Sequence, residues 1–85
     1  MARFGEILAE LRQDRGLTQE TLARVLFVTA GTISNYENNA HFPDIEKLTA
    51  LADFFDVSVD VLLGYDIKGK SRIEALARIK NYVLA

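Results

Sequence analysis

Residues 16–39 read GLTQETLARVLFVTAGTISNYENN, and the architecture of the chain follows from this stretch. Apolar residues recur in both of its halves at helical spacing: Leu22, Ala23 and Leu26, and then Ile33 and Tyr36. Thr18 and Thr29 stand just before the two series, and a threonine hydroxyl can cap a helix by accepting a hydrogen bond from a free backbone N–H group. The stretch therefore predicts two short helices, over about 18–26 and 29–37, separated by a brief turn.

Two longer helices are predicted on either side of this stretch. One spans about residues 3–15, where Gly16 is a suitable end, and the other follows Pro43 and is capped by Asp44. Their apolar residues recur at helical spacing, so that each helix has one face for the core. These faces consist of Phe4, Ile7, Leu8 and Leu11 in the first helix, and of Ile45, Leu48, Leu51, Ala52 and Phe55 in the second.

Two further helices are predicted toward the C-terminus. Ser58 can cap a short helix that ends at Leu63, although the pattern VSVDV at its start also alternates like a β-strand. Ser71 and Glu74 have the spacing of a capping box and open a helix that runs to about residue 84. No other segment favours a sheet, so the sequence predicts an all-α fold.

The predicted helices divide the chain into three parts. Residues 1–64 form a helix-turn-helix domain, residues 65–70 form a linker within the sequence GYDIKGK, and residues 71–85 form a C-terminal amphipathic helix. In a helix-turn-helix, the second helix of the pair can enter the major groove of DNA while the first braces against the DNA backbone. Helical hairpins are common, so this spacing alone carries little functional information.

The residue pattern of the helix pair is much more specific than its spacing. Residues 16–39, continued by FPDIEKLTALADFFDVSVDVLLG, resemble the Cro and phage-repressor type of helix-turn-helix domain, the XRE family, over about residues 4–64. The matching elements are Gly16-Leu17-Thr18-Gln19, Leu22-Ala23, Thr32-Ile33-Ser34, Tyr36-Glu37-Asn38, Pro43, and the series Leu48, Leu51 and Ala52. The resemblance implies a five-helix, lambda-repressor-like domain that reads DNA with helix 29–37. It also implies a sequence-specific, double-stranded-DNA-binding transcriptional regulator of bacterial or phage type, acting as a repressor.

The resemblance further implies which residues would contact DNA. Four positions of the reading helix would face base edges: Ala30, Gly31, Thr32 and Asn35. Chemistry agrees most for Asn35, whose amide can pair bidentately with adenine, and Thr32 can reach a base or a thymine methyl group. Contacts to the DNA backbone would come from Thr18, Gln19, Thr29, Asn38 and Asn39. Gln19 would also buttress the reading helix. In the alternative interpretation, Gln19 and Asn38 only cap helix ends and Asn35 is a solvated polar residue.

Arg12 and Glu37 match a pair of residues that form an ion pair in the family and tie the first helix to the end of the reading helix. A buried pair of this kind adds little net stability. Removal of one partner, however, costs about 3–5 kcal/mol because the other charge stays buried. The alternative is that Arg12 and Glu37 are two independent surface charges.

Two positions depart from glycines that are usual in the family. Phe27 lies in the turn between the paired helices, where a bulky residue at positive φ costs about 1–2 kcal/mol, so we expect a different turn conformation. Asn39 follows the reading helix, and asparagine tolerates the left-handed region. Gly31 lies inside the reading helix and should weaken it by roughly 1 kcal/mol relative to alanine.

Charge is distributed unevenly along the chain. Residues 1–64 hold five basic and ten acidic side chains, a net charge of −5, whereas residues 65–85 hold five basic and two acidic ones, a net charge of +3. Residues 29–44 contain no Lys or Arg, so attraction to DNA must come from helix N-termini and neutral donors. We expect a modest salt dependence, with about two to four phosphates neutralised per monomer. The acidic body leaves a second interpretation open: a helix-turn-helix protein-interaction module, or an antitoxin-like subunit with weak DNA binding.

The predicted C-terminal helix carries more apolar surface than docking on one domain requires. Ile73, Leu76, Ile79 and Val83 are the candidate interface for a second copy of the chain. A homodimer is therefore expected, with two half-sites on DNA roughly 34 Å apart. Alternatively, this helix closes the core of its own domain.

The sequence favours neither catalysis nor cofactor binding. Cysteine is absent, His41 is the one histidine, and no nucleophile–base or metal-ligand set is evident, so no catalytic site, metal or cofactor is expected. Residues 64–71 match the phosphate-loop pattern, but no parallel sheet is predicted behind them, and no small-molecule ligand is expected. No apolar run approaches the roughly 20 residues of a membrane span, and Met1 leads into charged residues rather than a signal peptide. We therefore expect a cytoplasmic protein without a membrane segment.

Overall fold

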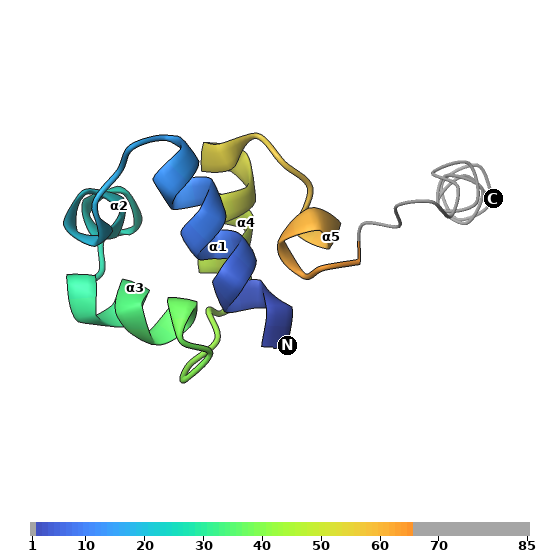
Figure 1. Cartoon of the computed structure of the whole chain (residues 1–85), viewed down its shortest axis with the longest axis horizontal. Coiled ribbons are helices and arrows are strands. Elements are labelled where there is room, and N and C mark those ends of the chain that lie inside the picture. The colour runs from blue at the N-terminus through green and yellow to red at the C-terminus, as the bar shows by residue number, and fades with distance from the viewer. Residues whose placement is uncertain (1, 66–85) are drawn as a thin grey trace, which may run out of the picture.

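The computed structural model describes residues 2–65, which fold into helices without a strand. The helices are α1 (Ala2–Asp14), α2 (Gln19–Leu26), α3 (Ala30–Glu37), α4 (Ile45–Phe55) and α5 (Val59–Leu62). In Figure 1, α1 crosses in front of α4, with α2 and α3 on one side of this pair and α5 on the other. The all-α prediction is confirmed, and the ambiguous VSVDV segment leads into a helix. Apart from Tyr65, the predicted linker 65–70 and helix 71–85 lie outside the described residues. None of the helices in residues 2–65 has the length and apolar character needed to cross a bilayer.

Capping side chains set the starts of four helices. Thr18, Thr29, Asp44 and Ser58 have extended backbones, and each accepts a hydrogen bond from the backbone N–H group three residues further on. A side-chain oxygen in this position satisfies one of the N–H groups that the first turn of a helix leaves without an internal partner. Local sequence therefore places the N-termini of α2 to α5.

One apolar core joins the helices. Its buried residues are Phe4, Leu8, Leu22, Ala23, Leu26, Ile33, Tyr36, Leu48, Leu51, Ala52, Phe55 and Leu62. The ring of Phe4 contacts those of Tyr36 and Phe42 edge-on, at centroid distances of 6.5 and 4.9 Å. Burial, and to a lesser degree the charge of Asp44, raises the pKa of the Tyr36 phenol above its ordinary value, so this core ring stays neutral at physiological pH.

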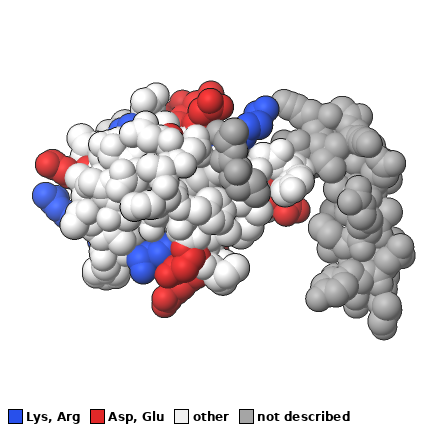
Figure 2. Space-filling view, turned by 90° about the horizontal axis from the view of Figure 1, so that it is seen from below, with Lys and Arg blue, Asp and Glu red and all other residues white. Residues whose placement is uncertain are grey.

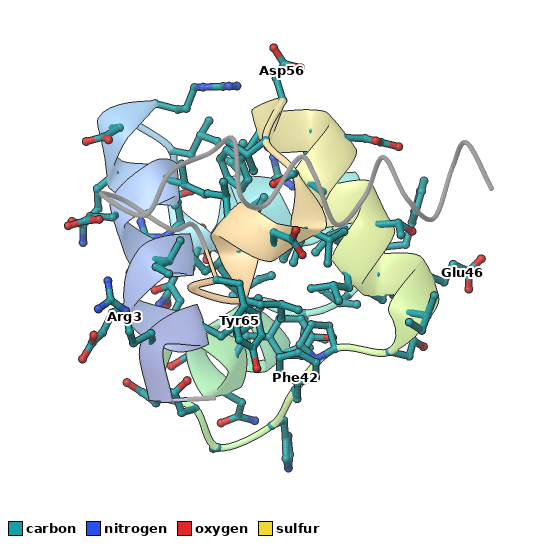
Figure 3. The ribbon with its side chains drawn as sticks, turned by 90° about the vertical axis from the view of Figure 1, so that its right-hand side faces the viewer. Arg3, Phe42, Glu46, Asp56 and Tyr65 are labelled. Atoms are coloured by element: carbon teal, nitrogen blue, oxygen red, sulfur yellow. The ribbon has the colours of Figure 1, made fainter. Side chains whose placement is uncertain are left out.

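Ile45 is an exception among the apolar residues predicted to be buried. Its side chain is 74% exposed, because it is the first residue of α4, at a helix end that neighbouring helices leave uncovered. Phe42 and Tyr65 are also exposed, and Figure 3 shows both at the lower end of the face that presents α5. The described domain thus keeps several large apolar side chains in contact with water.

The turn between α2 and α3 keeps the left-handed conformation although a phenylalanine occupies it. Phe27 has φ 59° and ψ 43°, and its side chain is 94% exposed. Our prediction of a different turn conformation is therefore wrong. The N–H of Phe27 donates to the C=O of Arg24, and the N–H of Val28 donates to the C=O of Ala23, which closes the C-terminus of α2. These bonds, together with the packing of Val28 against the core, offset a conformational cost of about 1–2 kcal/mol.

Gly5 and Asn39 bring α1 against the end of α3. A Cβ atom at Gly5 would collide with the carbonyl oxygen of Glu37 and lie 2.7 Å from that of Tyr36, so only glycine permits this approach of the two backbones. The N–H of Gly5 donates to Oδ1 of Asn39 at 3.0 Å. Asn39 has φ 62°, the left-handed conformation that asparagine tolerates. The C-terminal end of α3 is thereby held against α1.

Gly5→Ala and Gly31→Ala are expected to change stability in opposite directions. Gly5→Ala forces α1 and α3 apart and should lower the free energy of unfolding by about 1–3 kcal/mol. At Gly31 an added Cβ meets only the Thr29 hydroxyl, 3.7 Å away, so Gly31→Ala should raise the free energy of unfolding by about 1 kcal/mol, because alanine is the better helix former. Urea unfolding followed by circular dichroism measures both. A Gly5→Ala protein as stable as the unmodified chain would contradict the close approach of α1 and α3.

Candidate nucleic-acid interface

α3 lies at the surface with a face that carries almost no charge. Its sequence AGTISNYE contains one charged residue, Glu37, and its buried side chains are Ile33 and Tyr36. Figure 2 views the molecule from the side of α3 and of the loop that follows it, where neutral residues cover most of the face and charged ones gather toward its edges. Such a surface offers hydroxyl, amide and backbone groups to a partner in place of charges.

The four positions predicted to read bases are all accessible on α3. Gly31 is exposed, and Ala30, Thr32 and Asn35 are half-buried. The backbone C=O of Asn35 accepts hydrogen bonds from two N–H groups of the following loop. Within residues 2–65 its side-chain amide makes no hydrogen bond, so both its donor and its acceptor are available. The arrangement suits the predicted pairing with a base edge, and the contact itself stays a prediction.

Both helices of the pair begin with the same arrangement of two threonines. At the start of α2, the hydroxyl oxygens of Thr18 and Thr21 lie 2.9 Å apart, and at the start of α3 those of Thr29 and Thr32 lie 3.0 Å apart. In each pair the first hydroxyl oxygen also accepts the backbone N–H of the second threonine, at 3.0 and 3.1 Å. Each cap therefore places a hydroxyl at a helix N-terminus, where the helix dipole favours an anion.

Arg12, Gln19 and Glu37 form one hydrogen-bonded network that connects α1, α2 and α3. Nε of Arg12 donates to Oε2 of Glu37 at 2.6 Å, and Nη2 of Arg12 donates to Oε1 at 3.2 Å. Nε2 of Gln19 donates to the same Oε1 at 2.9 Å. The Arg12 and Glu37 side chains are 12% and 7% exposed, so they are not two independent surface charges. Gln19 reaches α3 as the resemblance implied, through the last residue of the helix.

The remaining backbone-contact candidates lie at the two ends of α3. Thr18 and Gln19, together with Arg12, Leu17, Glu20 and Ala30, line an open hollow of about 470 Å³ where the N-termini of α2 and α3 come together. At the other end, Nδ2 of Asn38 donates to the Ser34 hydroxyl at 3.4 Å, which is a weak hydrogen bond between two side chains. Oδ1 of Asn39 is turned toward the N–H of Gly5, so this acceptor serves the fold. The alternative that Gln19 only caps a helix end does not match its bond to Glu37.

Sequence reasoning missed two residues that hold this surface in place. The signal for Gly5 was a glycine inside an otherwise regular helical pattern, which often marks a close approach of two backbones. Arg15 donates from its guanidinium to the carbonyl oxygens of Phe54 and Phe55, at 3.4 and 3.1 Å, and lies over both rings. It thereby connects the segment after α1 to the C-terminus of α4. No pattern in the sequence around Arg15 predicts this contact. In residues 2–65, no group of His, Asp and Glu side chains is placed to hold a metal ion.

Comparison with known proteins places these features in one family. A family model described as helix-turn-helix matches residues 8–62. The chain is 37% identical over 84 residues to the HTH-type transcriptional activator BcrR of Enterococcus faecalis, and 36% identical over 79 residues to the HTH-type transcriptional regulator ImmR of Bacillus subtilis. These alignments cover 94% and 92% of this chain but 41% of BcrR and 62% of ImmR. The chain therefore spans less than two thirds of the length of either relative.

A solved structure shares the arrangement of helices. The P22 c2 repressor protein, determined in complex with a synthetic operator, superposes with a TM-score of 0.70 at 30% sequence identity. The superposition covers 74% of this chain and 96% of that chain. The predicted repressor-like fold of five helices is thus confirmed. The candidate dimer interface of Ile73, Leu76, Ile79 and Val83 lies outside the described residues.

Glu37→Ala is expected to lower the free energy of unfolding by about 3–5 kcal/mol, because the mostly buried Arg12 guanidinium loses its charged partner. The double variant Arg12→Met/Glu37→Leu should recover a large part of this loss, since it leaves neither charge buried. Glu20→Ala is the matched control: this exposed acidic residue of α2 should change stability by no more than about 0.5 kcal/mol. Urea unfolding measures all three. Equal unfolding midpoints for Glu37→Ala and Glu20→Ala would show that the network does not hold α3.

Proposed function

This chain belongs to the XRE-type helix-turn-helix family, and on that premise we propose that it is a transcriptional regulator that binds double-stranded DNA in a sequence-specific way. The observation that carries the proposal is α3 itself: an accessible helix whose Asn35 amide makes no hydrogen bond within residues 2–65, held to α1 and α2 by the network at Glu37. The similar P22 c2 repressor was determined on an operator, which supports α3 as the helix that enters the major groove. Proteins of this kind act by binding, so no catalytic step is part of the proposal.

The proposed contacts follow from the chemistry of the exposed groups. Asn35 donates to and accepts from adenine, Thr32 bonds a base edge or packs on a thymine methyl group, and Ala30 and Gly31 let the backbone approach the bases closely. Phosphates are bound by Thr18, Gln19, Thr29, Asn38 and Asn39. At the start of α2 and α3, these contacts add to free backbone N–H groups and to the positive end of each helix dipole. Such groups act over short distances, which compensates for the missing Lys and Arg side chains on α3.

We include in the proposal that two copies bind together. Ile73, Leu76, Ile79 and Val83 recur at helical spacing in the C-terminal segment, and a two-fold dimer would place two α3 helices one DNA turn apart, roughly 34 Å. The described domain also exposes the apolar side chains of Phe42, Ile45 and Tyr65, and a second copy is one partner that would cover them. A binding partner would remove this area from water.

Two finer points complete the proposal. A regulator acts in the compartment that holds its DNA, and for a protein of bacterial or phage type that compartment is the cytoplasm. The direction of regulation depends on where the operator lies relative to the promoter. Repression, as the sequence resemblance implied, stays a prediction, because BcrR is named an activator.

Selection of random duplex DNA on the purified protein tests the proposed function. We expect recovery of a two-fold symmetric site, and Asn35→Ala should lower affinity for that site by a factor of about 5 to 150, equivalent to 1–3 kcal/mol. Asn38→Ala, at the end of α3, should weaken binding to all sequences alike, because phosphate contacts do not distinguish bases. If low salt yields no enriched sequence, the protein-interaction module or antitoxin-like subunit is the better interpretation.

The proposed dimer is tested separately by Leu76→Asp, which places a charge in the predicted apolar interface. Sedimentation equilibrium should give a dimer for the unmodified chain and a monomer for this variant, because an unpaired charge is costly to bury. Arg78→Asp, a charge change in the same segment outside the predicted apolar series, is the control and should leave the dimer intact. A monomeric unmodified chain at micromolar concentration would contradict this part of the proposal.

A further inference from the structure

The threonine pair at the start of α3 contains one hydrogen bond whose direction is not fixed by the fold. The hydroxyl oxygens of Thr29 and Thr32 are 3.0 Å apart, and either can be the donor. Thr29 has already used one lone pair on the backbone N–H of Thr32, at 3.1 Å. Thr32 belongs to the predicted base-reading positions, whereas Thr29 is exposed at the helix N-terminus where a phosphate is expected. The hydrogen bond between the two hydroxyls therefore connects the expected DNA phosphate contact of Thr29 with the expected base contact of Thr32.

We propose that Thr29 is a positioning residue that sets whether Thr32 donates to or accepts from a base. The inference rests on the proposed DNA-binding function and specifies which class of base the start of α3 selects. When Thr29 binds a phosphate, Thr32 becomes an acceptor and selects a base that presents an amine in the major groove, adenine or cytosine.

Counting protons and lone pairs gives two arrangements. A hydroxyl has one proton to donate and two lone pairs that accept. In the first arrangement the Thr32 hydroxyl donates to Thr29, so both lone pairs of Thr29 are occupied, its own proton points outward, and Thr32 has only lone pairs left for DNA. In the second arrangement Thr29 donates to Thr32, so the outward proton belongs to Thr32 and Thr29 has no proton for a ligand.

DNA chooses between these arrangements because a phosphate oxygen can only accept. A phosphate next to Thr29 needs the outward proton of the first arrangement, and this choice leaves Thr32 as an acceptor. The major-groove edges of adenine and cytosine carry the amines N6 and N4, which donate, whereas thymine O4 and guanine O6 only accept. A keto oxygen opposite Thr32 would leave two acceptors facing each other, force Thr29 to give up its phosphate bond, or break the hydrogen bond between the two hydroxyls and leave their oxygens 3.0 Å apart without a proton between them. The phosphate contact and the base preference are thus coupled through one shared proton.

The pair at the start of α2 provides a control inside the same molecule. Thr18 and Thr21 have nearly the same geometry, with 2.9 Å between their hydroxyl oxygens and a 3.0 Å bond from the Thr21 N–H to Thr18. Neither belongs to the positions that face base edges. Loss of the Thr18 hydroxyl should therefore cost a phosphate contact without changing any base preference.

The experiment measures affinities of the full chain for operators that differ at one base pair. The operator comes from the selection described above, and the position facing Thr32 is the one whose preference Thr32→Val abolishes. Thr29→Gly removes the hydroxyl but keeps an acceptable N-cap, because glycine is tolerated there with little loss of stability. Thr18→Gly makes the same change on α2. Thr29→Asp keeps the cap and, as a pure acceptor, holds the Thr32 hydroxyl in the donating direction toward residue 29.

At the position facing Thr32, we expect the unmodified chain to favour an amine-bearing base over a keto-bearing one on the order of tenfold. Thr29→Gly should reduce this ratio to about twofold or less. Thr18→Gly should leave the ratio unchanged while weakening binding to every operator, and Thr29→Asp should retain it despite weaker binding through phosphate repulsion. Urea unfolding midpoints confirm that each variant is folded.

Four results would overturn the inference. The first three are a keto-bearing base as the preferred partner, an unchanged ratio in Thr29→Gly, and a loss of the ratio in Thr18→Gly as large as in Thr29→Gly. The same holds if Thr32→Val abolishes no preference at any position. If the initial selection recovers no operator, that result would instead count against the proposed DNA-binding function. Failure of this inference and failure of the proposed function are therefore distinguishable.

Discussion

The bond between Arg12 and Glu37 is the contact on which the geometry of the candidate interface depends. α3 has 8 residues and packs on the core through Ile33 and Tyr36, while Gly5 and Asn39 hold its C-terminal end against α1. Its last residue adds a charged connection to both neighbouring helices, because the Glu37 carboxylate accepts hydrogen bonds from Arg12 of α1 and from Gln19 of α2. Inside a protein such bonds are directional, and the loss of either charge leaves the other unpaired in a poorly solvated site. One side chain therefore joins three helices, and it acts together with the core packing to hold the exposed face of α3 in place.

Because the exposed face of α3 is nearly uncharged, any contact it makes depends strongly on how the helix is oriented. A basic surface attracts DNA over about a Debye length and tolerates small errors of position, whereas hydroxyls and amides contribute only when a partner atom lies at hydrogen-bond distance. Residues 1–64 carry a net charge of −5, so the body of the domain opposes approach to a polyanion. The helix N-termini at Thr18 and Thr29 counter this locally, since they concentrate N–H groups and partial positive charge where phosphates are expected. Selectivity in such a protein comes from the fit of neutral groups.

Backbone conformation at a few positions makes the helix pair possible, and here local rules both succeeded and failed. Asn39 occupies the left-handed region as its side chain permits, and the same region was expected to be avoided by Phe27. The failure at Phe27 has a physical cause: two hydrogen bonds at the C-terminus of α2 and the partial burial of the adjoining Val28 outweigh a local preference of about 1–2 kcal/mol. Gly5 shows the opposite case, in which an unremarkable glycine is required by a backbone that lies more than thirty residues away in the sequence.

Sequence by itself determined the helices, their capping residues and the neutral character of α3, because each of these depends on residues three or four positions apart. Through resemblance to a family, the sequence also pointed to Thr32 and Asn35 as candidate base contacts and to the pairing of Arg12 with Glu37. Only the tertiary structure decided that the amide of Gln19 donates to Glu37 and that Arg15 donates to the C-terminus of α4. It also decided that Ile45 is exposed to water. These contacts join positions 18 to 40 residues apart, or reflect which helix end is left uncovered. Periodicity assigns a side chain to a face of its own helix, but only the packing of several helices determines what that face meets.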